Sequence, residues 1–202
     1  MKMNKANQFG PSRMAGFTLM ELMIVLAMAG IIAAIGIPSF SSMITTNQLA
    51  DITNELTLAL KRARAEAIAS GRDVIVCSSI NSSGCSQAAG NWSKGWVVMV
   101  DRNQNGSFLE SEPNELFWVK TIDADTSTKI KITPGPFTTP DLPNDFSKEV
   151  RFSYTGELKA GTTGGFQICS GVTGSGFPRR EITVSVAGQT HFEKNTTATN
   201  NC

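Results

Sequence analysis

The stretch GFTLMELMIVLAMAGIIAAIGIPSF, residues 16–40, decides how the rest of the chain is interpreted. After Gly16 it is almost wholly apolar, and a helix over residues 17–40 would be about 36 Å long at about 1.5 Å per residue. That length exceeds the hydrocarbon core of a bilayer, which is about 30 Å thick. The run contains one acid, Glu21. Because an ionisable side chain at membrane depth is costly, Glu21 is a candidate functional residue.

The residues that precede this run are basic, with Lys2, Lys5 and Arg13 and no acid. Such a segment stays on the cytoplasmic side of the membrane, so the remainder of the chain is predicted to be exported. A secretory signal peptide does not fit, because the apolar run is too long and no clean Ala-x-Ala cleavage site follows it. A plain signal anchor fits the length but gives no reason for Glu21.

The basic leader, the residues GFTL at 16–19, Glu21 and the long apolar run together resemble the N-terminal signature of type IV pilins and their pseudopilin relatives. The resemblance implies that prepilin peptidase cuts between Gly16 and Phe17 and methylates the new amino group of Phe17. It also implies that Glu21 acts in assembly with other pilins or pseudopilins. We therefore expect a leader peptide at 1–16 and a transmembrane and filament-core helix at 17–40, with a single pass through the inner membrane.

The helix is predicted to continue beyond the membrane over residues 41–71. Pro38 is expected to kink it or to melt it locally, and Gly71 is expected to end it. Polar residues lie largely off a stripe of apolar side chains that recur every three or four positions. The stripe consists of Leu49, Ile52, Leu56, Leu60, Ala63 and Ala67. This pattern indicates an amphipathic helix that packs against a folded domain.

Residues 72–202 are predicted to form a β-rich periplasmic head. Seven short segments are β-branched or aromatic and are separated by Gly, Pro, Asn and Ser, as strands are. They are DVIVCSS, GWVVMVD, ELFWVKT, TKIKIT, EVRFSY, GGFQICS and REITVSV. Residues 132–146 hold four prolines and read as a long loop, and the tail EKNTTATNNC reads as disordered apart from its cysteine. The fold class is therefore α+β, with a long N-terminal helix packed on an antiparallel sheet domain.

The stretches ALKRARAEAIASGRDVIVC and NWSKGWVVMVDRNQNG resemble the minor pilins FimT and FimU and the type II secretion pseudopilin GspH. This likeness implies a minor pilin that enters or primes a type IV pilus, with a pseudopilin of type II secretion as the alternative. Pro38 favours the pilus. Some FimT-like proteins bind DNA through Gly-Arg-x-Arg near the C-terminus, where this chain has GQTH at 188–191. Arg179 and Arg180 lie nearby and are the candidate DNA-binding residues, so DNA capture stays a third reading.

Composition argues against catalysis and against a strongly basic nucleic-acid binder. Removal of the three leader cations changes the net charge from +1 to −2. His191 is the sole histidine, so no histidine-based metal cluster can form, and no catalytic motif is present. We therefore expect no enzyme activity and no cofactor, apart from the calcium loop described below.

The four cysteines are predicted to form disulfides in the periplasm. They lack metal-ligand spacing, and four cysteines allow three pairings. The favoured pairing joins Cys77 with Cys85, which closes a short polar loop, and Cys169 with Cys202, which holds the tail. The alternative is free thiols.

The segment DRNQNGSFLESE, residues 101–112, fits the template of an EF-hand calcium loop at every fixed position. Its oxygen ligands would come from Asp101, Asn103, Asn105, Ser107 and Glu112. The flanking segments are strands instead of two helices, and only two of these ligands are charged, so the expected affinity is weak. The alternative is a simple Asn-Gly hairpin turn.

Overall fold

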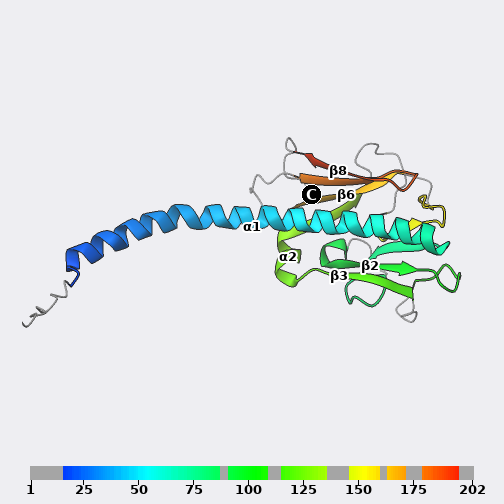
Figure 1. The fold of residues 1–202 in the computed structure, drawn as a ribbon, viewed down its shortest axis with the longest axis horizontal. Helices are drawn as coiled ribbons and strands as arrows, with labels where there is room; N and C mark the ends of the chain where they lie inside the picture. The colour runs from blue at the N-terminus through cyan, green and yellow to red at the C-terminus, as the bar shows by residue number, and fades with distance from the viewer. Residues whose placement is uncertain are drawn as a thin grey trace, which may run out of the picture. The chain divides into compact units, whose positions relative to one another are not determined.

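The computed structural model describes residues 16–86, 91–108, 115–135, 146–159, 163–171 and 179–195. Contacts divide the chain into two compact units, Met1–Ser42 and Met43–Cys202. The described elements are α1 (Leu19–Ser70), β1 (Val74–Ser78), the 3-10 helix η1 (Asn91–Lys94), β2 (Gly95–Val100), β3 (Leu116–Thr121), α2 (Ala124–Lys129), β4 (Ile130–Gly135), β5 (Glu149–Phe152), β6 (Gly164–Ser170), β7 (Arg179–Val184) and β8 (Thr190–Asn195) (Figure 1).

Helix α1 ends where the sequence places its stop signal. Gly71 has φ +64°, and the N–H of Arg72 donates to the carbonyl oxygen of Ala67 at 3.3 Å, as in a Schellman cap. The helix continues without a break through residue 38, so the prediction that the helix melts locally at this proline is wrong.

The strands form two antiparallel four-stranded sheets. Sheet A has the order β3-β2-β1-β5, and sheet B has the order β4-β6-β7-β8. In sheet A, Val74 lies opposite Val100 of β2 on one side and Phe152 of β5 on the other, which joins segments far apart in the sequence. The fold is therefore α+β, as predicted.

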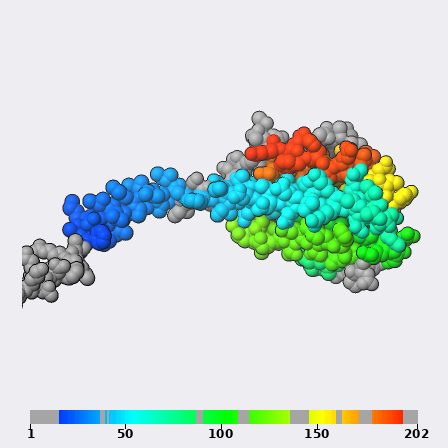
Figure 2. Space-filling model, in the orientation of Figure 1, coloured from blue at the N-terminus to red at the C-terminus, as the bar shows by residue number. Residues whose placement is uncertain are grey.

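The C-terminal half of α1 packs against both sheets. Its predicted stripe is buried as a whole and shares one hydrophobic cluster with side chains of β1, β2 and β4 to β7. Figure 2 shows this part of α1, in cyan, along the seam between the green and red parts of the domain. Trp92 of η1 is a fully buried member of the cluster. Its Nε1–H donates to the carbonyl oxygen of Phe146 at 2.9 Å, and its ring packs edge-on against Phe166 with 4.7 Å between the ring centroids.

Besides the 3-10 helix η1, two elements of the domain were not predicted. The six-residue helix α2 occupies Ala124–Lys129, and β4 follows it directly, so the segment TKIKIT is helical at its start. Strand β8 covers Thr190–Asn195, so the first residues of the supposedly disordered tail belong to a sheet. The predicted loop at 132–146 also begins too early, because β4 continues to Gly135.

Candidate functional site

The predicted processing site lies just before the first turn of α1. Gly16, Phe17 and Thr18 precede the helix, and the Phe17 side chain is 85% exposed. The hydroxyl oxygen of Thr18 accepts the N–H of Glu21 at 3.1 Å, which caps the helix N-terminus. Because the cap uses the backbone of Glu21, it does not depend on the carboxylate. The sequence analysis missed this cap, although Thr-x-x-Glu is its recognised pattern.

The apolar part of α1 has the composition of a membrane-spanning helix. The window Leu19–Gly36 has a mean hydropathy of 2.3, and none of it is buried within the structure. Large apolar side chains, from Leu19 to Ile35, are exposed all around this helix. A helix that is apolar on every side requires a membrane or a protein assembly around it.

The disulfide between Cys77 and Cys85 is confirmed. It attaches the loop after β1 to the outer face of sheet A, where Cys77 joins a second apolar cluster with Met99 and Phe108. Cys169 is also disulfide-bonded. Cys202, its predicted partner, lies outside the described residues.

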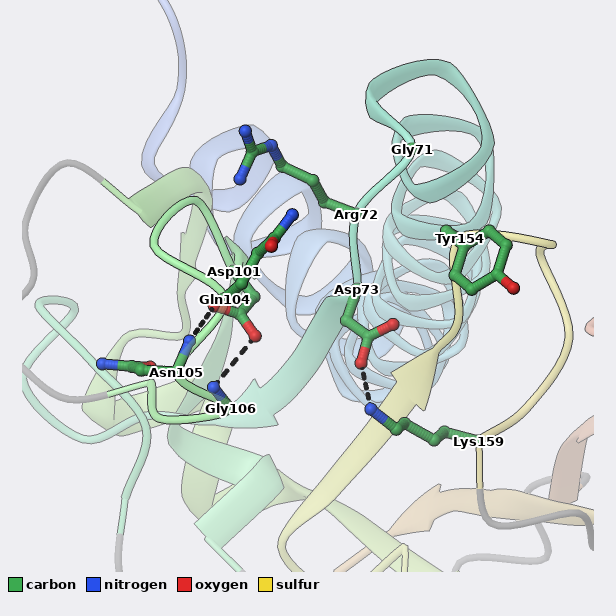
Figure 3. Close-up of a pocket in the computed structure, with 9 residues that line it drawn as sticks. All are labelled: Gly71, Arg72, Asp73, Asp101, Gln104, Asn105, Gly106, Tyr154 and Lys159. Atoms are coloured by element: carbon green, nitrogen blue, oxygen red, sulfur yellow. Dashed lines mark hydrogen bonds and ion pairs between the residues drawn. The ribbon is translucent and has the colours of Figure 1, made fainter.

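In the loop after β2, polar side chains accept hydrogen bonds from backbone N–H groups of the same loop. The carboxylate of Asp101 accepts the N–H groups of Asn105, at 3.1 Å, and Gly106, at 3.0 Å (Figure 3). The side-chain oxygen of Asn103 accepts the N–H of Asn105 at 2.9 Å, and that of Asn105 accepts the N–H of Ser107 at 2.7 Å. Four of the five residues predicted to bind calcium thus belong to one hydrogen-bonded loop, whereas Glu112 lies outside the described residues.

Glu115 is the acid that the sequence analysis missed. It is 3% exposed, and its Oε1 accepts the N–H of Arg102 at 2.9 Å and of Asn103 at 3.2 Å. It lies three residues beyond the acid of the calcium template, so pattern matching could not select it. Within the described part of the chain, no group of three or more His, Cys, Asp or Glu side chains is placed to hold a metal ion. A cation at this loop would therefore take its oxygen ligands from two carboxylates and from amide and carbonyl groups.

A hollow of about 370 Å³ lies beside this loop. Asp101, Asn105 and Gly106 form one wall, and Arg72 and Lys159 belong to the others (Figure 3). Both cations are engaged: Lys159 pairs with Asp73, and Arg72 donates to the carbonyl oxygen of Arg102.

The two candidate DNA-binding arginines do not form a joint basic surface. They are adjacent on β7, so their side chains point to opposite faces of sheet B. Arg179 pairs with Glu181 at 2.5 Å, which neutralises its charge. Arg180 lies over the ring of Phe192 at 5.8 Å, and partial burial lowers the pKa of its guanidinium. Residues 188–191, in the place of the DNA-binding motif, form the turn into β8 and its first residues.

Comparison with known proteins adds two family matches. Residues 53–189 match the family described as "Type II transport protein GspH", and residues 11–37 match the "Prokaryotic N-terminal methylation motif". The second match spans the bond between Gly16 and Phe17 as well as Glu21.

Sequence relatives match the N-terminal region. A fimbrial protein of Pseudomonas aeruginosa is 43% identical over 60 residues, which cover 30% of this chain and 38% of that protein. The type IV major alpha-pilin of Moraxella bovis is 49% identical over 41 residues, which cover 20% and 26%. The chain thus spans less than two fifths of the length of these relatives.

Among solved structures, the type IV minor pilin FimU of Pseudomonas aeruginosa aligns at 20% identity and a TM-score of 0.49. The alignment covers 73% of this chain and 89% of that one. The GspH match itself extends over more than half of the chain, from the buried part of α1 to the turn before β8. The protein therefore belongs to the GspH family of type IV pilin-like proteins.

Proposed function

We propose that this protein is a minor pilin that is processed by prepilin peptidase and then enters, or primes, a type IV pilus. The observation that carries the proposal is an exposed Gly16–Phe17 bond followed at once by a capped helix that is apolar on every side. A peptidase needs an accessible bond outside regular structure. A subunit that later leaves the bilayer needs an apolar helix that neighbouring subunits can surround.

The proposed location is the inner membrane, with one pass and with the head in the periplasm. The basic leader favours a cytoplasmic N-terminus, and the Cys77–Cys85 disulfide is compatible with an oxidising compartment. The proposed partners are prepilin peptidase and other pilins. The role is structural, so no catalytic residue is assigned.

Glu21 is proposed to guide docking of the subunit into the filament. After cleavage, the amino group of Phe17 would lie about one helical turn from Glu21, or the amino group of a neighbouring subunit would take that place. A carboxylate in an apolar medium requires a partner of opposite charge. Because the Thr18 cap uses the backbone N–H of Glu21, loss of the carboxylate leaves the start of the helix in place.

Processing is tested by the intact mass of the protein purified from membranes. We expect a mature chain that begins at Phe17 and carries one methyl group on its amine. A terminus after Ser39 would instead indicate an ordinary signal peptidase and would contradict the proposal.

Assembly is tested with Glu21→Gln, which removes the charge and preserves the size of the side chain. We expect the variant to be cleaved and anchored normally, but to lose co-purification with other pilins and to reduce the number of pili per cell. Thr18→Ser, which keeps a capping hydroxyl, is the matched control and should behave as wild type. Normal piliation of Glu21→Gln together with normal protein secretion would refute the role of the charge.

The second candidate is a pseudopilin of type II secretion, which the match to the family of type II transport protein GspH favours. The same Glu21→Gln variant separates the two functions, because a pseudopilin defect would block protein secretion and leave the number of pili unchanged.

DNA capture is the third candidate, and the pairing of Arg179 with Glu181 argues against it. We expect weak or no retention of duplex DNA at physiological salt, and a gel-shift titration checks this. Binding that survives about 150 mM salt and is lost in the double variant Arg179→Ala, Arg180→Ala would reverse this ranking.

A further inference from the structure

Two almost fully buried carboxylates, one just after β2 and one just before β3, have no ion-pair partner among the residues that the structure describes. Asp101 is 5% exposed, and Glu115 is 3% exposed. A buried charge is unfavourable unless a counter-charge or enough hydrogen bonds compensate for it. Two such charges of the same sign, both bound to the loop after β2, require more compensation than one.

Backbone amides compensate only part of this charge. Asp101 receives two N–H groups, from Asn105 and Gly106, and Oε1 of Glu115 receives those of Arg102 and Asn103. The other carboxylate oxygen of Glu115, Oε2, is fully buried and has no hydrogen-bond partner in the described structure. Since Oε1 of the same carboxylate is bound to the loop, Oε2 is also held against it. This unpartnered oxygen is what a cation at the loop would contact.

The loop also supplies neutral oxygen atoms. The side-chain oxygens of Asn103 and Asn105 belong to this loop, where each accepts the N–H of the residue two positions ahead. Positive φ angles at Gln104 (59°) and Gly106 (72°) turn the chain back on itself, so that the N–H groups of Asn105 and Gly106 reach the carboxylate of Asp101. The side chains of Asn103 and Asn105 lie on the exposed side of this turn. Ser107 adds a backbone carbonyl.

We propose that the loop Asp101–Ser107, closed by Glu115, binds a calcium ion. Calcium takes six to eight oxygen ligands in a flexible arrangement, which two carboxylates, two amides, a carbonyl and water provide. Magnesium requires a stricter octahedron at shorter distances and keeps its water, so it fits this donor set less well. The acid assigned to the site is Glu115, which the structure places against the loop, in place of Glu112, which occupies the last position of the sequence template.

The site would be weak. Two carboxylates give a low ligand charge, and extracellular calcium modules of this kind have dissociation constants of about 0.1 to 1 mM. Arg72 lies nearby, although its guanidinium donates to the carbonyl oxygen of Arg102. An ion that binds only the folded state raises the unfolding temperature, and bound calcium would link the end of β2 to the start of β3.

The test uses the full chain, purified in a non-ionic detergent and stripped with EDTA. Thermal unfolding is followed by tryptophan fluorescence, and calcium binding is measured directly by titration calorimetry. With about 10 mM CaCl₂ we expect Tm to rise by about 5 °C, and with MgCl₂ at the same concentration by less than half of that. No rise and no binding heat with calcium, or an equal rise with magnesium, would overturn the proposal.

Variants assign the residues. Glu115→Gln and Asp101→Asn keep an acceptor oxygen but remove one charge each, and should weaken calcium affinity by about tenfold or more. Asp125→Asn, an acid outside the loop that pairs with Lys129 on α2, is the matched control and should keep the full response. If the calcium response persists in both loop variants, the site is wrong. If a loop variant does not fold, Asn103→Ala, which retains both carboxylates, should still show a reduced calcium affinity; an unchanged affinity would overturn the assignment.

Discussion

Replacement of Leu56 by Ala tests how strongly α1 is held by the two sheets. The Leu56 side chain is 0% exposed and belongs to the main apolar cluster. Leu→Ala at such a position removes buried methyl groups and leaves a cavity, at a cost of about 2 to 5 kcal/mol, and we expect about 3 kcal/mol here. The slightly better helix propensity of Ala offsets only a few tenths of a kcal/mol. For a domain of this size the loss corresponds to about 6 to 12 °C in Tm.

The matched control is Leu58→Ala, the same substitution two residues further along the same helix. Leu58 is 43% exposed, so its truncation removes less buried area and should cost less than about 1 kcal/mol. Both variants change helix propensity equally, so the difference between them isolates the packing of α1 against the sheets.

Urea unfolding of the unit Met43–Cys202, followed by tryptophan fluorescence, provides the measurement. Trp92 and Trp96 are fully buried, so their emission reports on the core. We expect Leu56→Ala to lower the midpoint at an unchanged m-value. If the free energies of unfolding of the two variants differ by less than about 1 kcal/mol, the inferred packing of α1 between the sheets is refuted.

Three further predictions concern the domain's cross-link, a turn and a helix cap. The double variant Cys77→Ser, Cys85→Ser should lose about 2 to 3 kcal/mol in urea unfolding, because the bond closes a short loop with a sequence separation of 8. Gly188→Ala should lower Tm more than Gly71→Ala: both glycines have positive φ, but a Cβ at 188 would lie 2.1 Å from a backbone oxygen, whereas 71 is open; equal losses would contradict this. The backbone N–H of Thr126, at the start of α2, donates to the Asp123 carboxylate and lowers its pKa below the ordinary value of about 3.9. The cap therefore stabilises the folded domain fully above about pH 3.9, and this stabilisation is lost as pH falls through the lowered pKa. Melting curves from pH 6 to about 2 should therefore show the Tm advantage over Asp123→Ala shrinking at acid pH, and a constant difference would refute it.

The strongest sequence signals were the unusual length of the apolar run and the regular spacing of apolar residues over several helical turns. The apolar run could only be a membrane or filament helix by its length, and the stripe from Leu49 to Ala67 fixed the buried face of α1 through its spacing alone. Strands β1, β2 and β6 were also predictable, because they are short apolar runs between turn residues.

Short or polar elements gave no such signal. Helix α2 is too short to show a period, and the cap at Asp123 was its only cue. Strand β8 has the polar sequence THFEKN, and it is a strand because its backbone pairs with β7 at the edge of sheet B. Backbone pairing with β7 uses no side chains, so it leaves no apolar pattern in the sequence of β8.

Local sequence was enough to predict the disulfide between Cys77 and Cys85, because the two residues lie close enough along the chain to close a loop. The roles of Gly16, Phe17 and Glu21 in processing and assembly stay predictions. The tertiary structure decided what depends on direction or distance in space. It placed Arg179 and Arg180 on opposite faces of sheet B and brought Glu115 against the loop that begins at Asp101. Sequence spacing could not reveal either arrangement, because strand alternation and the path of the β2–β3 connection set where a side chain lies.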